Sequence, residues 1–441
     1  MSSFPRTSLG EIADFVNGDR GSNYPSEDDF VPNGVPFISA ADLADGVVDL
    51  AGVKRISREA YERLRSGKTK PGDILFCLRG SLGKAGRVFG VPEAAIASSL
   101  VIIRAKQTTA SRFLYYVLQS PDVQGFMDAL DNGSVQPNLS VREITKIVVP
   151  DISAHEQRAI DHILGTLDDK IELNRRMNET LEAMARALFK SWFVDFDPVR
   201  TKMDGRWRRG ESTPGLPNHL YDLFPDRLVP SELGDIPKGW AVQPLPEVVA
   251  VNPTRYLRRG EVAPYLDMAN MPTRGQSPDV VIDRAFGSGM RFLNGDTLVA
   301  RITPCLENGK TAFVDFLDAD QVGWGSTEFI VLRPKPPLPP EFAYCLARSV
   351  EFRNFAIQSM TGSSGRQRVP ADALSQFKLV VGPRVIAELL GSLIQPLFAR
   401  ARAAIRESRT LAGIRDALLP KLISGELRME CAERFTGGGT A

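Results

Sequence analysis

The chain contains few histidines and cysteines, which limits the metal and redox chemistry that it can support. Its 441 residues include only 3 histidines and 4 cysteines. The cysteines lie far apart and form no C-x-x-C pair, so neither a disulfide framework nor a zinc site is expected. His155 and His162 fall on one expected helix, where we interpret them as solvated positions. We therefore predict no metal site in this chain.

An excess of charge of one sign and long apolar runs are also missing. Lys and Arg number 54 and Asp and Glu 53, a net charge of +1, so composition gives no sign of a nucleic-acid partner and any DNA-binding face has to be local. No stretch reaches the ~18 apolar residues of a membrane span, and the first ten residues carry no signal-peptide pattern. We expect a cytoplasmic protein.

The common catalytic motifs are absent as well. Gly309-Lys310-Thr311 lacks the earlier glycine of a phosphate-binding loop, because Pro304 stands at that position. Asn252-Pro253 is not followed by the proline and aromatic residue of DNA amino-methyltransferases. A binding protein is favoured. Two alternatives stay open: a DNA methyltransferase or nuclease with an unrecognised site, and a coiled-coil scaffold with no DNA role.

The sequence does contain an internal repeat. Segments of the first half recur in the same order in the second half, about half the chain length further on, which indicates two copies of one domain. The matching pairs are Leu9–Ile12 with Leu245–Val248, Pro36–Leu43 with Pro264–Met271, Gly72–Leu75 with Gly295–Leu298, Phe113–Tyr115 with Phe342–Tyr344, and Gly133-Ser134 with Gly362-Ser363.

A long helix is expected after each copy. Ser153 and Glu156 form a capping-box pattern at the start of the first helix. Apolar positions then step by four and three, a heptad pattern that predicts an antiparallel coiled coil. The first stripe is Ile160, Leu164, Leu167, Ile171, Asn174, Asn178, Leu181, Ala185 and Leu188; the second is Ile386, Leu390, Leu393, Leu397, Arg400, Ala404, Glu407, Leu411, Ile414 and Leu418.

Polar residues interrupt the middle of both stripes. Asn174 and Asn178 on the first helix, and Arg400 and Glu407 on the second, are expected to fix the register of the pair. Pro396 predicts a kink or a restart of the second helix.

These features predict an α/β (α+β) fold with a pseudo-two-fold internal repeat. Two similar domains with mixed sheets are separated by two long antiparallel coiled-coil helices. The expected boundaries are 1–150 and 238–383 for the two domains, 151–204 and 384–427 for the helices, 205–237 for a Gly- and Pro-rich linker, and 428–441 for a tail.

This organisation resembles the specificity subunit of type I restriction-modification systems. The resemblance is carried by the two helices, by the linker with Ser231–Trp240, and by Leu418–Leu427 near the end of the chain. It implies a non-catalytic DNA-binding protein whose two α/β domains are target recognition domains, each reading half of a bipartite, asymmetric site. It also implies complexes with two methyltransferase (modification) subunits for N6-adenine methylation and with restriction subunits. S-adenosylmethionine, ATP and Mg are then expected in those partners, and no cofactor is expected in this chain.

Long polar side chains in the expected loops are the candidates for contacts with DNA. Arg and Lys suit guanine O6 and N7, Asn and Gln suit adenine, and either cation suits phosphate. The candidates are Arg79, Ser81, Lys84, Arg87, Gln136 and Asn138 in the first copy, and Arg301, Thr303, Asn308, Lys310, Ser363, Ser364, Arg366, Gln367 and Arg368 in the second. A solvated surface role is the alternative for each of them, and an internal ion pair is a further one for Arg79.

Overall fold

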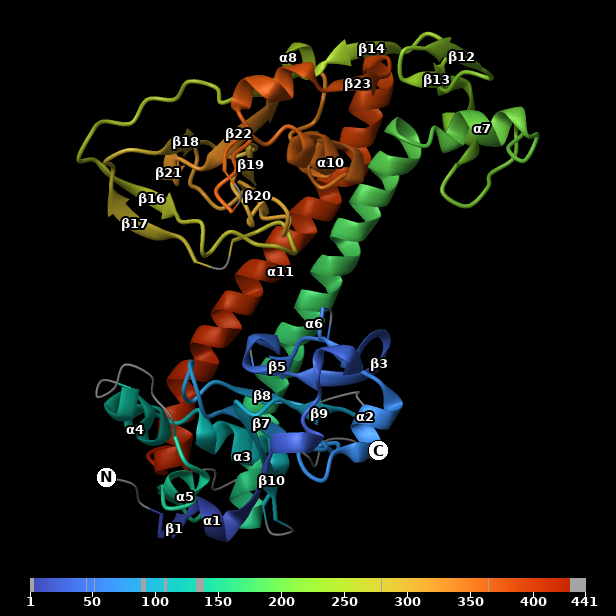
Figure 1. Ribbon diagram of the computed structural model, residues 1–441. Helices are drawn as coiled ribbons and strands as arrows, with labels where there is room; N and C mark the ends of the chain where they lie inside the picture. The colour runs from blue at the N-terminus through green and yellow to red at the C-terminus, as the bar shows by residue number, and fades with distance from the viewer. Residues whose placement is uncertain are drawn as a thin grey trace, which may run out of the picture. The chain divides into compact units, whose positions relative to one another are not determined.

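A computed structural model gives the fold of most of the chain. It describes residues 4–44, 46–50, 52–88, 93–106, 109–131, 139–278, 280–363 and 365–428. The chain divides into two compact units (Figure 1). Unit 1 comprises Met1–Ile171 and Arg409–Ala441, and unit 2 comprises Glu172–Ser408. Both α6 (Ala154–Phe193) and α11 (Arg384–Ser424) therefore contribute to both units.

Unit 1 is built on a mixed sheet with the strand order β2-β10-β7-β8-β5-β4. Smaller sheets have the orders β6-β3-β9 and β1-β11. The strands are β1 (Arg6–Ser8), β2 (Ala13–Asn17), β3 (Phe30–Ile38), β4 (Leu43–Ala44), β5 (Val47–Val48), β6 (Arg55–Ile56), β7 (Ile74–Cys77), β8 (Ala85–Arg87), β9 (Ala95–Ile96), β10 (Leu100–Ala105) and β11 (Val148–Pro150). The helices are α1 (Leu9–Ile12), α2 (Arg58–Arg63), α3 (Ser111–Leu118), α4 (Pro121–Asp131) and α5 (Val141–Ile144), with 3-10 turns η1 (Gly21–Asn23), η2 (Glu27–Asp29) and η3 (Ala40–Asp42).

Unit 2 repeats this plan. Its sheets have the orders β15-β22-β19-β20, β17-β16-β21-β18, β14-β23 and β12-β13. The strands are β12 (Leu228–Ser231), β13 (Gly234–Pro237), β14 (Ala241–Pro244), β15 (Val249–Val251), β16 (Val262–Leu266), β17 (Ile282–Ala285), β18 (Met290–Phe292), β19 (Thr297–Ala300), β20 (Thr311–Phe313), β21 (Gly323–Gly325), β22 (Phe329–Pro334) and β23 (Lys378–Val381). The remaining elements are α7 (Asp197–Met203), α8 (Leu245–Val248), α9 (Glu341–Ala347), α10 (Val350–Gln358), η4 (Asn218–Leu223) and η5 (Ala371–Gln376).

The matching topology confirms the internal repeat. The order β2-β10-β7-β8 in unit 1 corresponds to β15-β22-β19-β20 in unit 2, with α1 and α8 at the same place before the first strand. Each unit also contains one parallel strand pair outside this order: β3 with β9 in unit 1, and β16 with β21 in unit 2. Both copies are therefore mixed α/β domains.

The central strands are buried on both faces, which explains their continuous apolar sequences. Successive side chains point to opposite faces of a sheet, so each strand supplies two cores. In β7, Ile74 and Phe76 pack in the core that α3 covers, whereas Leu75 and Cys77 pack in the core on the other face. In β19, Val299 and Leu298 are divided between two cores in the same way.

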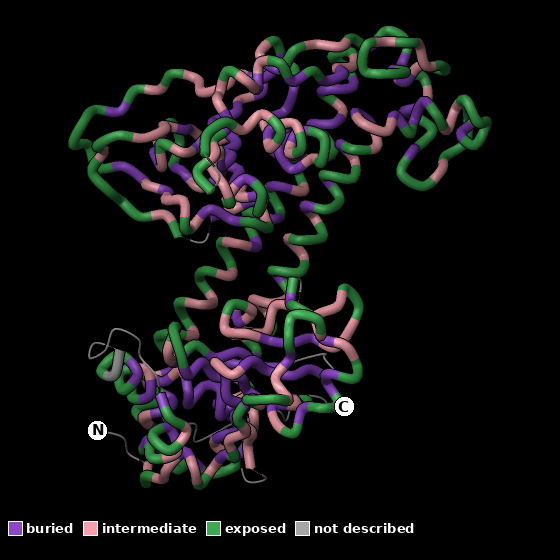
Figure 2. Tube along the Cα trace, in the orientation of Figure 1, coloured by how far each residue is buried: buried purple, intermediate pink, exposed green. Residues whose placement is uncertain are grey.

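The stripe predicted on the first helix is confirmed. α6 begins after Ser153, whose Oγ accepts a hydrogen bond from the Glu156 N–H at 3.3 Å. All nine predicted positions are buried or half-buried, and Asn174 is fully buried. Figure 2 shows this alternation of buried and exposed turns along both long helices.

The stripe predicted on the second helix is wrong at every second position. Leu393, Arg400, Glu407 and Ile414 are exposed. The packed positions are instead the next residues along the chain, Ile394, Ala401, Ser408 and Arg415. Apolar positions on a helix can follow each other at steps of three or four residues. Here two steps of four follow each other, from Ile386 to Leu390 and to Ile394, so the packed position lies one residue after the predicted Leu393. Arg400 therefore does not lie in the helix interface. The predicted restart at Pro396 is also wrong, because α11 continues through it.

Residues 205–237, expected to be a linker, pack against the core of unit 2. Trp207 is 1% exposed, and its ring lies 5.1 Å from that of Tyr221 and 6.4 Å from that of Phe224. Arg206 and Arg209 pair with Asp204 and Asp222. The arginines around Trp207 thus lie beside a tryptophan that is buried in the core of unit 2.

Candidate nucleic-acid interface

In each unit, polar loops predicted from the sequence lie at the end of one central strand. This strand is β7 in unit 1 and β19 in unit 2. We call residues 78–84 and 139–141 the first strand-end site, and residues 301–303, 328, 361–363 and 365–369 the second. The backbone is held in the same way in both. The Leu78 N–H donates to Ser99 O at 2.9 Å, and the Leu78 carbonyl accepts from the Leu139 N–H at 3.0 Å. Arg301 makes the corresponding bonds with Glu328 O at 3.0 Å and Val369 N–H at 2.8 Å.

The first strand-end site borders an open cavity of about 470 Å³. Arg79, Ser81 and Lys84 are exposed on the loop after β7. Gln136 and Asn138 lie outside the described residues. The cavity is lined by Asn17, Gly18, Asp19, Arg20, Ser66, Leu78, Arg79, Leu139, Ser140 and Val141. Two arginines line this cavity, and the sequence interpretation missed one of them, Arg20, which lies three residues after the end of β2.

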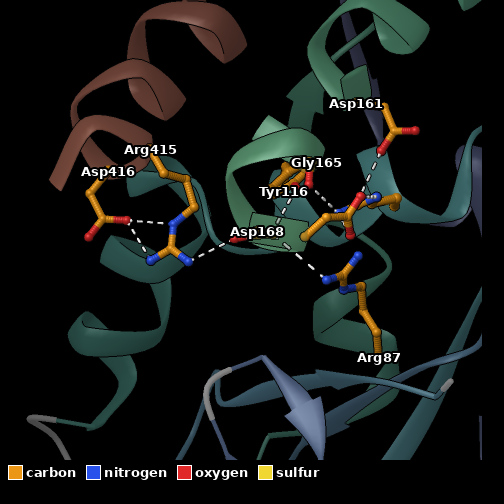
Figure 3. A network of polar contacts seen from close by, with 9 residues as sticks. Arg87, Tyr116, Asp161, Gly165, Asp168, Arg415 and Asp416 are labelled. Carbon is orange, nitrogen blue, oxygen red and sulfur yellow. Dashed lines mark hydrogen bonds and ion pairs between the residues drawn. The ribbon is translucent and has the colours of Figure 1, made fainter. Parts of the chain in front are cut away.

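Arg87 does not belong to this surface. It is only 9% exposed, its guanidinium lies 3.8 Å from the Asp168 carboxylate, and it stacks on the Tyr115 ring at 5.1 Å (Figure 3). The short strand β8 directs this side chain toward α3 and α6. Burial thus removes Arg87 from the loop surface on which it was predicted.

The second strand-end site brings together residues from three separate segments. Thr303 Oγ1 accepts a hydrogen bond from Gln367 N–H and donates to Gln367 O, both at 3.1 Å. Arg368 pairs with Thr361 through two backbone hydrogen bonds of 2.9 Å. The predicted loop thus lies directly beside the end of β19. Ser363 and Arg366 are exposed on it, and Ser364 lies outside the described residues.

Two candidates of the second copy lie apart from this cluster. Asn308 is exposed in the turn before β20. Lys310 is half-buried, and its Nζ donates to Met268 O at 2.6 Å and to Ala269 O at 3.1 Å. Those bonds hold the chain after β16, so Lys310 has a structural role here.

A carboxylate that the sequence interpretation missed lies in the second site. Glu328 precedes β22 and pairs with both Arg301 and Arg368. Its only local signal is its position directly before an apolar run. The partners are far apart in the sequence, so no local pattern could have found the contact.

Two cysteines are buried and the three histidines are exposed. Burial raises the pKa of the Cys77 thiol and of the Cys345 thiol, which keeps both protonated at neutral pH. His155 and His162 are exposed, as predicted, and His219 is exposed too. Within the described ranges, the acidic residues, histidines and cysteines form no group of three that could hold a metal ion. No described helix is long and apolar enough to cross a membrane.

Comparison with known proteins points to one family. Residues 4–183 match the type I restriction modification DNA specificity domain. The type I restriction enzyme MjaIX specificity subunit of Methanocaldococcus jannaschii is 25% identical, over 96% of this chain and 92% of the relative. The HindI specificity subunit of Haemophilus influenzae is 23% identical, over 97% of this chain and 100% of the relative.

The fold agrees with a solved member. The crystal structure of the type I restriction-modification system S subunit from M. genitalium superposes with a TM-score of 0.52 at 15% identity, over 96% of each chain. The comparisons thus agree with the duplicated α/β fold: residues 4–183 are a type I restriction modification DNA specificity domain, and the chain is similar over nearly its full length to type I specificity subunits.

Proposed function

We propose that this subunit recognises a bipartite, asymmetric DNA site, one half through each strand-end site, and thereby positions two methyltransferase subunits for N6-adenine methylation. The observation that carries the proposal is the repeated backbone frame with different side chains. Leu78 and Ser99 occupy in unit 1 the places that Arg301 and Glu328 occupy in unit 2. Two similar frames with unequal side chains suit two unequal half-sites, whereas a homodimer would require a palindrome.

The two long helices are long enough to span the distance between two half-sites. α6 has 40 residues and α11 has 41. At 1.5 Å per residue each helix extends about 60 Å, more than the ~34–36 Å that separates half-sites one DNA turn apart. The proposal includes restriction subunits as further partners in the cytoplasm, with S-adenosylmethionine, ATP and Mg bound by the partners.

Reconstitution with the modification subunits tests the proposal. We expect the complex to methylate adenine in a split site, mapped by sequencing of methylated DNA, and the isolated chain to transfer no methyl group. Methyl transfer by the isolated chain would favour the enzyme alternative. DNA binding by the complex that does not weaken with salt would favour the scaffold alternative, since phosphate contacts make affinity fall as salt rises.

A further inference from the structure

Arg301, Glu328 and Arg368 form an ionic cluster at the second strand-end site. Arg368 Nε lies 3.0 Å from each oxygen of Glu328, and Arg368 Nη2 lies 2.9 Å from Oε1. Arg301 Nε lies 3.5 Å from Oε2 of the same carboxylate. The Arg368 side chain remains 54% exposed, against 28% for Arg301 and 21% for Glu328. The outer arginine is thus held from behind by a more buried carboxylate.

The geometry of this pair leaves one edge of the guanidinium available. Arginine has five N–H donors in a fixed plane. Glu328 occupies the edge formed by Nε and Nη2. The edge between the two Nη atoms can still donate two parallel hydrogen bonds. The backbone of Arg368 is fixed by its bonds to Thr361, so the side chain starts from a defined position.

We propose that Arg368, oriented by Glu328, reads a guanine in the half-site recognised by unit 2. This inference rests on the proposed function. Guanine presents two acceptors, O6 and N7, in the major groove, which match two parallel N–H donors. Adenine has its N6 amino group, a donor, where guanine has O6. Arginine has only donors, so it cannot form a hydrogen bond with that amino group. Glu328 is a positioning residue, and Arg301 provides it with a second counter-charge.

Among the described residues of the first strand-end site there is no such cluster. At the positions equivalent to Arg301 and Glu328 it has Leu78 and Ser99, held by equivalent backbone bonds. A guanine read in this manner is therefore specific to the half-site of unit 2. The same backbone arrangement thus carries an arginine and a glutamate in unit 2, and a leucine and a serine in unit 1.

Competition binding by the complete complex with its modification subunits tests the inference. The probes are DNA duplexes in which each base pair of the recognised site is replaced in turn. We expect R368A to lose discrimination at one G·C pair of one half-site by roughly tenfold or more and to leave the other positions unchanged. R368K should lose most of it too, because a lysine cannot form the bidentate contact.

Two further variants separate positioning from general structural effects. E328Q should reduce discrimination at the same base pair, and E328D should restore part of it. R384A removes another exposed arginine of unit 2 that pairs with a glutamate, Glu388, outside the strand-end site, and should keep the wild-type profile. A change at the same G·C pair in R384A would contradict a role confined to Arg368 and Glu328.

Uniform weakening on all duplexes would overturn the inference. If R368A lowers affinity equally at every position and reduces the salt slope by about one, Arg368 contacts phosphate instead of guanine. An unchanged R368A profile, with a wild-type complex that discriminates, would also overturn it and leave the proposed function intact. A wild-type complex with no sequence preference would instead sink the proposed function, and the guanine assignment with it.

Discussion

Asp168 joins three parts of unit 1 through one carboxylate. Tyr116 of α3 donates its hydroxyl to Asp168 Oδ2 at 2.7 Å, and Arg415 of α11 donates to Oδ1 at 2.9 Å. Arg87 of β8 lies 3.8 Å away. The Asp168 side chain is only 10% exposed, and burial, then the charge of Asp168, raises the pKa of Tyr116. Within unit 1 the carboxylate fixes the α/β domain to α6 and α11 together (Figure 3).

Removing this charge should destabilise unit 1. D168N leaves Arg87 and Arg415 without their shared anion in a mostly buried site, and breaking such a pair costs about 3 kcal/mol. Hydrogen exchange of the α3 amides would measure the loss in free energy of opening. D416N is the matched control, because Asp416 pairs with the same Arg415 but is 63% exposed, and its loss should cost less than about 1 kcal/mol. Equal effects of the two variants would contradict the role given to Asp168.

Single residues show where sequence interpretation reaches its limit. Arg79 and Arg368 are exposed on loops that the Gly-rich patterns indicated. Arg87 looked equivalent to them, but its partner Asp168 lies far along the chain. Glu328 acquires its meaning only when three segments meet. Burial and long-range ion pairs depend on tertiary packing, which local residue patterns do not contain.

At the scale of elements, the register of α6 against α11 depends on a buried polar contact. Asn174 Nδ2 donates to Glu407 Oε2 at 2.8 Å and also lies 3.3 Å from Ser408 Oγ and 3.4 Å from Ala404 O. Its Oδ1 is buried without a hydrogen-bond partner among the described residues. A polar residue at a seam position costs stability and fixes the alignment of the helices. The predicted contact between the polar centres is confirmed for Asn174 and Glu407, and the residue expected beside them, Arg400, is exposed.

Replacing Asn174 by leucine should separate stability from register. N174L removes an unsatisfied oxygen, which costs about 1–3 kcal/mol when buried, so the variant should be as stable as the wild type or more so. Without the bond to Glu407, other alignments of the helices become accessible. We expect the complex to methylate sites whose spacer is one base pair longer or shorter more nearly as well as its own site, measured on a series of duplexes.

N178L provides the comparison for this variant. Asn178 Oδ1 is also buried and lacks a hydrogen-bond partner among the described residues, but no contact like that of Asn174 to Glu407 holds it. N178L should raise stability and leave the spacer preference unchanged. If N178L relaxes the spacer preference and N174L does not, Asn178 and not Asn174 fixes the register of the helices.

At the scale of the whole molecule, the chain contains one plan twice. A small antiparallel pair closes each copy, since Arg6 pairs with Pro150 in unit 1 and Ala241 pairs with Val381 in unit 2. Chain entry and exit are therefore adjacent in each α/β domain. The net charge of +1 means that any DNA-binding surface of this plan has to be local. The sequence revealed the duplication because matching segments recur in order, whereas the packed face of α11 needed the fold.

Adjacent ends make an exchange of the two domains feasible. Replacing residues 241–381 by a second copy of residues 6–150 joins the chain at equivalent points of equivalent strands. Both α3 and α9 carry a tyrosine that donates to a carboxylate of α6: Tyr116 to Asp168 at 2.7 Å and Tyr344 to Glu182 at 2.9 Å. The exchanged domain thus enters a site of related chemistry.

The hybrid should recognise a palindrome. Two identical domains read two identical half-sites, both of the kind that unit 1 reads. Mapping of N6-methyladenine after reconstitution with the modification subunits would show the new site, and the guanine assigned to Arg368 should no longer be required. The reverse exchange should produce the other palindrome, with that guanine in both halves. Retention of the original asymmetric site by either hybrid would place DNA recognition outside the exchanged residues, because the strand-end site of each α/β domain lies within them.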